Sequence, residues 1–268
     1  IWYTNCMENI NKTYHAMAFF DLDGTLLNQQ SKLDEEVIQA LHHIRRNGIL
    51  PVIATGRGHF ELDSLMAQSG ITSVVAMNGQ YIIVEGETIY HEPMAVANIQ
   101  RLKTLADAKH QALAFYNKES YCVSEMTSLV KDAYGYTDAP LPTVNDTRYL
   151  TDEINMLLIF SNQASDVAYY QNLVPEFNYF KNTPYSIDII NAGSNKGTGF
   201  KKVVELLGFT GETYGFGDGP NDIHLLESVD HATAMGNAID ELKTIAEFTS
   251  TANTDHGIVN AFKHWGWL

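Results

Sequence analysis

The chain has 268 residues, of which 45% are hydrophobic, enough for one domain of ordinary size and a substantial second module. Its formal net charge of -15 argues against a general surface that binds nucleic acids or anionic membranes, because both partners are polyanions. No apolar run approaches the roughly 18 residues that a bilayer-spanning helix needs. A small phosphorylated partner stays compatible with this charge, because local cations can reverse the potential inside one cleft.

The first 17 residues have neither the basic start nor the apolar core of a secretory signal, and we leave the first dozen outside the fold prediction. The two cysteines, Cys6 and Cys122, are far apart and have no metal-binding spacing. A chain of this size with two isolated cysteines is typical of a reducing compartment. We therefore expect a cytoplasmic protein without a disulfide framework, and its oligomeric state stays open.

Strands and helices are predicted to alternate from residue 16 to residue 77. Short apolar runs predict strands at 16–20, 49–54 and 71–77. Apolar residues at three- and four-residue spacing predict a helix over 34–46, with Ser31 near its start as the capping side chain. A second helix is expected through Leu65 and Met66, ending at Gly70. This order is typical of a doubly wound parallel sheet.

A different pattern follows from residue 81 to residue 185. Alternating apolar residues predict a hairpin around Glu85 and Gly86. Beyond it we predict helices over 94–108 and 165–173, and strands at 113–116, 121–123 and 154–160. The segment is too long for an ordinary crossover connection. We therefore expect an inserted α+β module over 85–185.

The doubly wound pattern then returns. A helix is predicted over 196–207, a strand at 213–216, a helix over 221–227 and a strand at 232–235. The expected fold class is α/β, with a Rossmann-like core built from residues 14–84 and 186–268. In open sheets of this kind, ligands bind beyond the carboxyl ends of the strands.

Two acidic residues, Asp21 and Asp23, follow the first predicted strand. Side chains alternate along a strand, so these two can meet at one centre only if the chain curls, which Gly24 permits. When two carboxyl groups lie at one reaction centre, one can be an ionised nucleophile and the other a proton donor. Taken alone, a pair of acids at this spacing would instead indicate a solvated turn or a helix cap.

Three further motifs begin or end predicted elements. Thr55 offers a hydroxyl group at a strand end, and Gly56 lets a backbone N–H approach an anion, although Thr55 could also be a helix cap. Lys196 begins a helix, where the dipole disfavours a cation, which fits a lysine that faces phosphate, although most lysines are solvated at the surface. Asp218 supplies the hard oxygen ligand that magnesium prefers.

Two neighbours of these motifs have open roles. Asp222 is either a metal-site carboxylate or the cap of the helix that it begins. Arg57 either reaches the substrate or pairs with an acid.

Together these stretches resemble the haloacid dehalogenase (HAD) superfamily. Residues 20–25, with the sequence FDLDGT, are similar to motif I of its phosphatases. Thr55, Lys196 and the GDGPND segment at 217–222 resemble motifs II, III and IV. With Met77-Asn78-Gly79 and the AMGNA segment at 234–238, the chain resembles the Cof-type branch, whose type IIB cap lies between motifs II and III. Only one helix fits between Asp23 and Thr55, so the cap cannot lie there.

The resemblance implies a phosphatase in which Asp21 attacks phosphorus and Asp23 is the general acid and base. It implies a Mg²⁺ ion held by the Asp21 carboxylate, the Asp23 backbone carbonyl and the Asp218 carboxylate. The implied contacts of the substrate phosphate are Leu22, Thr55, Gly56, Lys196 and Asn221. Asp222, Arg57 and Asn78 are expected as supporting neighbours.

The resemblance also implies a class of substrate, the phosphate monoesters of small metabolites: sugar phosphates, nucleotides or phosphorylated cofactors. The cap is expected to contact the leaving group and to set specificity. Two alternatives stay open. One is a phosphotransferase or phosphomutase acting on phosphosugars, and the other is a non-catalytic binding module on the same fold.

Overall fold

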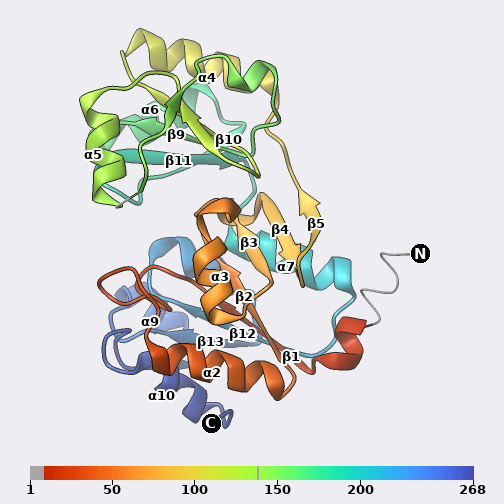
Figure 1. The fold of residues 1–268 in the computed structure, drawn as a ribbon. Helices are drawn as coiled ribbons and strands as arrows, with labels where there is room; N and C mark the ends of the chain where they lie inside the picture. Colours follow the sequence, from red (N-terminus) through yellow and green to blue (C-terminus); the bar gives the residue numbers. More distant parts are fainter. Residues whose placement is uncertain (1–8, 138) are drawn as a thin grey trace. The chain divides into compact units, whose positions relative to one another are not determined.

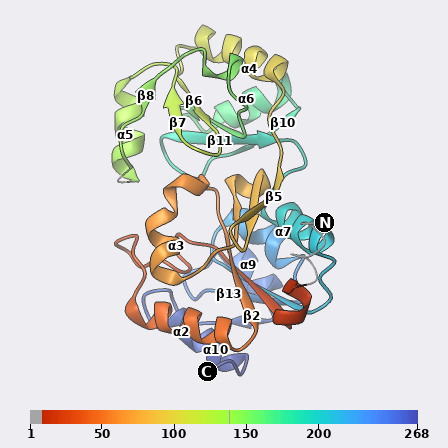
Figure 2. The same ribbon diagram turned by 45° about the vertical axis from the view of Figure 1, so that its right-hand side comes forward.

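The computed structural model describes residues 9–137 and 139–268, which form two compact units. The first unit contains residues 9–57, Glu61–Tyr90 and Asn195–Leu268, and the second contains Gly58–Phe60 and His91–Ser194. Figures 1 and 2 show that each unit is built around its own sheet. Cys6 lies outside the described residues, whereas Cys122 is a buried free cysteine.

The first unit has an eight-stranded sheet in the order β14-β13-β12-β1-β2-β3-β4-β5. Neighbours from β14 to β3 pair in parallel, and β3 pairs with β4 in antiparallel. The strands are β1 (Ala16–Phe20), β2 (Ile49–Ala54), β3 (Val74–Ala76), β4 (Tyr81–Val84), β5 (Glu87–His91), β12 (Glu212–Gly217), β13 (His231–Ala234) and β14 (Phe248–Thr249). This parallel-rich α/β sheet confirms the predicted fold class.

Helices cover both faces of this sheet, as the alternation of side chains along β1 requires. The ring of Phe19 packs edge-on against Phe200, with 5.0 Å between centroids, whereas Phe20 points the other way and contacts Phe216 and Phe262. Phe200 lies in a helix that covers one face of the sheet, and Phe262 lies in a helix that covers the other face. The helices are α2 (Glu35–Arg46), α3 (Asp63–Ser69), α7 (Lys196–Leu207), α8 (Ile223–Leu226), α9 (Asp240–Ile245) and α10 (Gly257–His264).

Several boundaries differ from the prediction. Ser31 does not cap α2: Asp34 is the N-cap residue without a side-chain capping bond, and its carboxylate accepts a hydrogen bond from Asn28 Nδ2 at 2.7 Å. Ser31 instead has a positive φ of 54° in the preceding turn. The strand expected at 71–77 is only Val74–Ala76. The helix expected over 221–227 is a 3-10 turn (Pro220–Asp222) followed by α8.

The second unit has a six-stranded, mainly antiparallel sheet in the order β10-β11-β9-β6-β7-β8. One face packs on α4 and α6, where Ile99, Leu102 and Tyr170 join the apolar core. Its strands are β6 (Leu113–Tyr116), β7 (Tyr121–Val123), β8 (Thr143–Val144), β9 (Met156–Phe160), β10 (Phe177–Phe180) and β11 (Ser186–Asn191), and its helices are α4 (Val96–Ala108), α5 (Ser128–Tyr136) and α6 (Ser165–Leu173).

The expected range of the inserted module, 85–185, stays a prediction. The main segment of the second compact unit, His91–Ser194, begins and ends a few residues later. Strand β5 belongs to the eight-stranded sheet, although the inserted module was expected to begin before it. Strand β11 belongs to the six-stranded sheet, although the core was expected to resume at residue 186. In both cases hydrogen bonds to a neighbouring strand decide the assignment.

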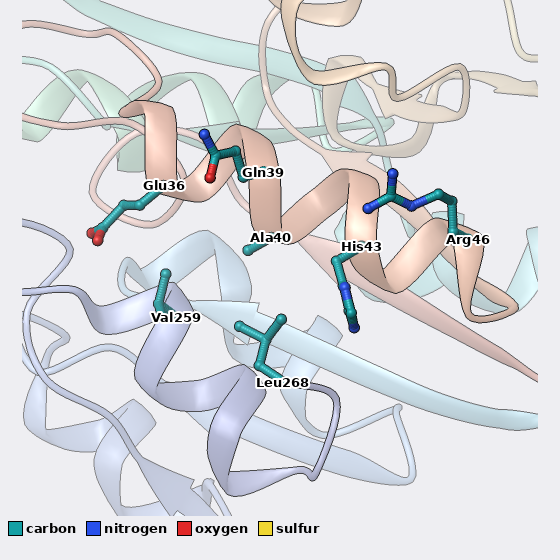
Figure 3. A pocket seen from close by; sticks show the side chains of 7 residues that line it. All are labelled: Glu36, Gln39, Ala40, His43, Arg46, Val259 and Leu268. Carbon is teal, nitrogen blue, oxygen red and sulfur yellow. The ribbon is translucent and has the colours of Figure 1, made fainter.

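Figure 3 shows a surface hollow between α2 and α10. Glu36, His43 and Arg46 line it from α2, and Val259 and Leu268 line it from the C-terminal segment. None of the motif residues of the sequence lines this hollow. Among the described helices, none is both long and apolar enough to cross a bilayer.

Gly199 lets α7 approach the sheet closely. A Cβ atom there would lie 2.5 Å from Val75 Cγ1 and 2.9 Å from the Cα of Gly79. We expect Gly199→Ala to lower the free energy of unfolding by about 1–3 kcal/mol, because overpacking outweighs the gain in helix propensity. Thermal or urea unfolding followed by circular dichroism measures the change.

The control is Gly135→Ala, in the last turn of α5. A Cβ atom at Gly135 has nothing within 4 Å. This variant should gain up to about 1 kcal/mol from its lower backbone entropy when unfolded. Equal effects of the two substitutions would contradict close packing at Gly199.

Candidate active site

Three neighbouring parallel strands end in the sequence motifs. Strand β1 lies between β2 and β12, and Phe20 is in register with Ile53 and Phe216. Asp21, Thr55 and Asp218 each directly follow one of these strands. Because parallel strands have their carboxyl ends at one edge of the sheet, the three loops converge there.

The loop after β1 curls back at Gly24, as its sequence predicted. Gly24 has φ +87°, and the carbonyl of Leu22 accepts hydrogen bonds from the amides of Thr25 and Leu27. A Cβ atom on Gly24 would lie 2.2 Å from Asp218 Oδ2. Glycine is therefore needed both for the left-handed backbone and for the approach of the Asp218 carboxylate.

Lys196 lies completely buried at the start of α7. Its Nζ donates to Asp21 Oδ1 and, at 2.6 Å, to Asp222 Oδ1. The helix end is capped by Asn195, whose side chain accepts from the backbone N–H of Thr198. Lys196 is thus an internal cation, and the solvated-surface alternative is excluded.

Asp222 is also fully buried, and both of its oxygens accept hydrogen bonds. Oδ1 accepts from Lys196, while Oδ2 accepts from the backbone amides of Asp218 and Gly219, both at 3.0 Å. The bond from Gly219 is the reach-back half of a capping box on the 3-10 turn. Asp222 therefore caps this turn and also fixes the loop that carries Asp218.

Carboxylate oxygens of Asp21, Asp218 and Asp222 lie within 4.8 Å of one another. Burial, followed by the charge of Asp222, raises the pKa of Asp21 well above its ordinary value. The same two causes raise the pKa of Asp218 to about 6. One ammonium group donates to two of these three carboxylates. Clustered hard oxygen donors are the ligands that a divalent cation prefers. The residues present therefore fit such an ion.

The side chain of Asp23 is not part of this cluster. It accepts two hydrogen bonds from Arg57, from Nη2 at 2.5 Å and from Nε at 3.0 Å. Two parallel bonds of this kind are the strong bidentate form of an ion pair. Arg57 thus pairs with an acid, which is one of the two roles that the sequence left open, while 56% of the Asp23 side chain is exposed.

Thr55 lies buried after β2, held by the segment that follows β3. Its carbonyl accepts from the amide of Asn78 at 2.9 Å, and its hydroxyl accepts from the amide of Arg57 at 3.1 Å. Asn78 has a left-handed backbone, with φ 52° and ψ 38°. A Cβ atom on Gly56 would lie 3.3 Å from Asn78 Nδ2, so glycine leaves room for this amide.

The side-chain amide of Asn78 is buried, and neither its Nδ2 nor its Oδ1 has a hydrogen-bond partner in residues 9–137 and 139–268. The other two residues expected at the phosphate occupy the loops already described. Leu22 is fully buried beside Asp21, and Asn221 is half-buried in the 3-10 turn. Their contacts with a substrate stay a prediction.

Two polar residues at this edge escaped the sequence prediction of site residues. Thr25 Oγ1 donates to Asp218 Oδ1 at 3.0 Å, and Asn237 Nδ2 lies 3.3 Å from Asp218 Oδ2. Both belong to segments that resemble family motifs, FDLDGT and AMGNA, and that position is the signal that could have identified them.

Replacing Lys196 should reveal the repulsion between its two acidic partners. Lys196→Met leaves Asp21 and Asp222 buried without a cation, so the free energy of unfolding should fall by about 3–5 kcal/mol at pH 8. Burial already raises the pKa of Asp21, and without the ammonium group that pKa rises further above its unfolded value, so the folded variant binds more protons than the unfolded chain. The loss should therefore shrink between pH 8 and pH 5.

Denaturant unfolding in the presence of a chelator, at both pH values, measures this difference. Lys201→Met, at an exposed position of the same helix, is the matched control and should change stability little. A loss in Lys196→Met that is the same at pH 5 and pH 8 would contradict the interpretation.

Comparison with known proteins bears on this site. A family model for haloacid dehalogenase-like hydrolases matches residues 18–262. The putative phosphatase YkrA of Bacillus subtilis is 33% identical over 254 residues, covering 94% of this chain and 98% of the relative. The 5-amino-6-(5-phospho-D-ribitylamino)uracil phosphatase YitU of the same organism is 26% identical and covers 95% and 98%.

A solved structure of a similar protein has a similar fold. BT4131, described as a HAD subclass IIB sugar phosphatase, has a TM-score of 0.83 and 26% identity, over 94% of this chain and 99% of that protein. These matches extend through both the core and the inserted segment. The family predicted from the motifs is confirmed, and the chain belongs to the haloacid dehalogenase-like hydrolases.

Proposed function

We propose that this hydrolase is a Mg²⁺-dependent phosphatase that cleaves phosphate monoesters of small metabolites through an aspartyl-phosphate intermediate. The observation that carries the proposal is the buried cluster in which Lys196 holds one oxygen of Asp21 beside the carboxylates of Asp218 and Asp222. A nucleophilic carboxylate needs this restraint, because it must meet phosphorus in line with the leaving oxygen.

In the first step, an oxygen of Asp21 forms a bond to phosphorus while the bond from phosphorus to the ester oxygen breaks. Asp23 gives its proton to the departing alkoxide. In the second step, Asp23 takes a proton from water, whose oxygen attacks phosphorus and releases Asp21 and inorganic phosphate. During this cycle the Asp23 carboxyl group must leave its ion pair with Arg57 and contact the leaving oxygen instead.

The surrounding residues bind the phosphoryl group and offset its charge. Lys196 supplies a fixed cation, Thr55 a hydroxyl group, and Leu22, Gly56 and Asn221 the further contacts that the resemblance implies. Asp21, Asp218 and the backbone carbonyl of Asp23 would hold Mg²⁺. The bound ion would act as a Lewis acid toward the phosphoryl oxygens. Asp222 acts through the Asp218 loop and Lys196 rather than on the substrate.

The names of two relatives support a substrate class. The name of YitU specifies a phosphorylated ribitylaminouracil, and BT4131 is described as a sugar phosphatase. We propose sugar phosphates and phosphorylated ribityl or nucleoside compounds as the first compounds to assay. A second sugar in the same reaction distinguishes the alternative, because a phosphotransferase would phosphorylate that sugar instead of releasing phosphate.

Asp21→Asn should abolish phosphate release from every ester that the wild type hydrolyses, because an amide is not a nucleophile for phosphorus. Its fold should persist, since the side chain keeps its size. Phosphate release with Mg²⁺ and with a chelator, together with circular dichroism, measures both effects. Near-normal activity of this variant would exclude the aspartyl phosphate, and a wild type equally active in chelator would exclude the metal.

Asp23→Asn should lower kcat by roughly 10²–10⁴-fold, the usual range for loss of a general acid and base. The loss should be smaller for leaving groups that need no proton, such as p-nitrophenolate, than for sugar alkoxides. Steady-state rates with both esters measure this contrast. An equal loss for the two esters would contradict proton transfer from Asp23 to the leaving group as the step that limits the rate.

A further inference from the structure

Asn237 joins two of the loops that build the proposed metal site. It follows β13, and its side-chain Nδ2 donates to the backbone carbonyl of Gly24 at 2.9 Å. The same Nδ2 lies 3.3 Å from Asp218 Oδ2. One amide group therefore contacts both the loop after β1 and the carboxylate that follows β12.

The orientation of this amide is fixed from its other end. Asn237 Oδ1 accepts a hydrogen bond from the backbone N–H of Asn253 at 2.9 Å. A backbone N–H can only donate, so the atom that it contacts must be the amide oxygen, and the NH₂ group must face Asp218. Asn253 is anchored in turn, because its Nδ2 donates to the carbonyl of Leu27 at 2.7 Å.

Asp218 is restrained through both its side chain and its backbone. Thr25 donates to Oδ1 and Asn237 to Oδ2, so each carboxylate oxygen has one donor and keeps lone-pair capacity for a cation. Its backbone N–H donates to Asp222, and its carbonyl accepts from Ile239 at 3.0 Å. Ile239 is two residues after Asn237, so a single loop restrains both ends of this residue.

We infer that Asn237 is a positioning residue for the metal-ligating carboxylate of Asp218. It acts through Asp218 and the Gly24 carbonyl, and it contacts neither phosphorus nor the nucleophile. The inference rests on the proposed function, because it assumes a divalent cation at the carboxylates. Residues that hydrogen-bond a metal ligand commonly account for 10–100-fold in metal affinity.

The test measures metal binding without substrate. Mn²⁺, whose free form gives a sharp electron paramagnetic resonance signal, is titrated into the full-length wild type and into Asn237→Ala, and Mg²⁺ competition follows. The dissociation constant of Asn237→Ala for Mn²⁺ should rise about 10–100-fold. In activity assays, the metal concentration for half-maximal rate should rise likewise, whereas kcat at saturating metal should change much less.

The control is Asn260→Ala. Asn260 also makes side-chain bonds that hold a loop, to Thr251 Oγ1 and to the carbonyl of Asp255, and neither bond reaches Asp218. Its Mn²⁺ affinity should stay within twofold of the wild type. Asn237→Ser, a smaller change at the same exposed position, replaces Asn237→Ala if the latter fails to fold.

The outcomes are distinguishable. A folded Asn237→Ala that binds Mn²⁺ within twofold of the wild type would overturn the positioning role and leave the proposed phosphatase intact. Equal weakening in Asn260→Ala would also overturn it, because the effect would then be loop stability. A wild type that binds no Mn²⁺ would overturn both proposals.

Discussion

The candidate active site of this protein depends on one buried ammonium group. Lys196 is completely removed from solvent and donates to Asp21 and Asp222, residues that lie 175 and 26 positions away in the chain. Burying a lysine is expensive unless its charge is paired, and burying two carboxylates without it is more so. The three side chains therefore impose on each other a geometry that none would adopt alone, and the loops that carry them must meet.

This constraint explains why the site is made of loops that are themselves restrained. Asp222 gives one oxygen to Lys196 and the other to the amides of Asp218 and Gly219, so the ammonium group is connected to the Asp218 loop through a single carboxylate. Gly24 allows the Asp218 carboxylate to lie close to the backbone of the loop after β1. One acid, Asp21, is thereby kept buried with its pKa raised, next to another, Asp23, that is exposed and paired with Arg57. The two carboxyl groups, two positions apart in the chain, therefore lie in very different surroundings.

Much of the core could be predicted because its signals are local. Strands β1, β2 and β12 are short apolar runs that end in glycine-containing polar motifs, and α2 and α7 have clear helical periodicity. Elements such as β10, β11, α9 and α10 were not predicted. Strand β11 alternates Ile187 and Ile189 with Ser186 and Asp188. Its place in the second sheet, however, depends on pairing with β9, which sequence spacing does not reveal.

The residues of the candidate site divide in the same way. Asp21, Thr55, Lys196 and Asp218 could be singled out because they lie at strand or helix ends within segments that resemble family motifs. The shared role of Asp222 and the contacts of Asn237 depend on which side chains lie opposite them after folding. An asparagine in a Gly-Asn-Ala turn has no property that indicates a carboxylate from a different loop as its partner.

The order of the strands has a consequence for synthesis on the ribosome. Strand β1 lies between β2 and β12, so the centre of the larger sheet needs Glu212–Gly217, which are made long after Ala16–Phe20. All six strands of the smaller sheet lie between Leu113 and Asn191 and are finished before β12 emerges. Since chains emerge from the N-terminus and domains generally fold as units, the inserted unit can become compact while the apolar run of β1 still lacks one of its two neighbours. A nascent chain halted before residue 212 would therefore present that exposed run to chaperones.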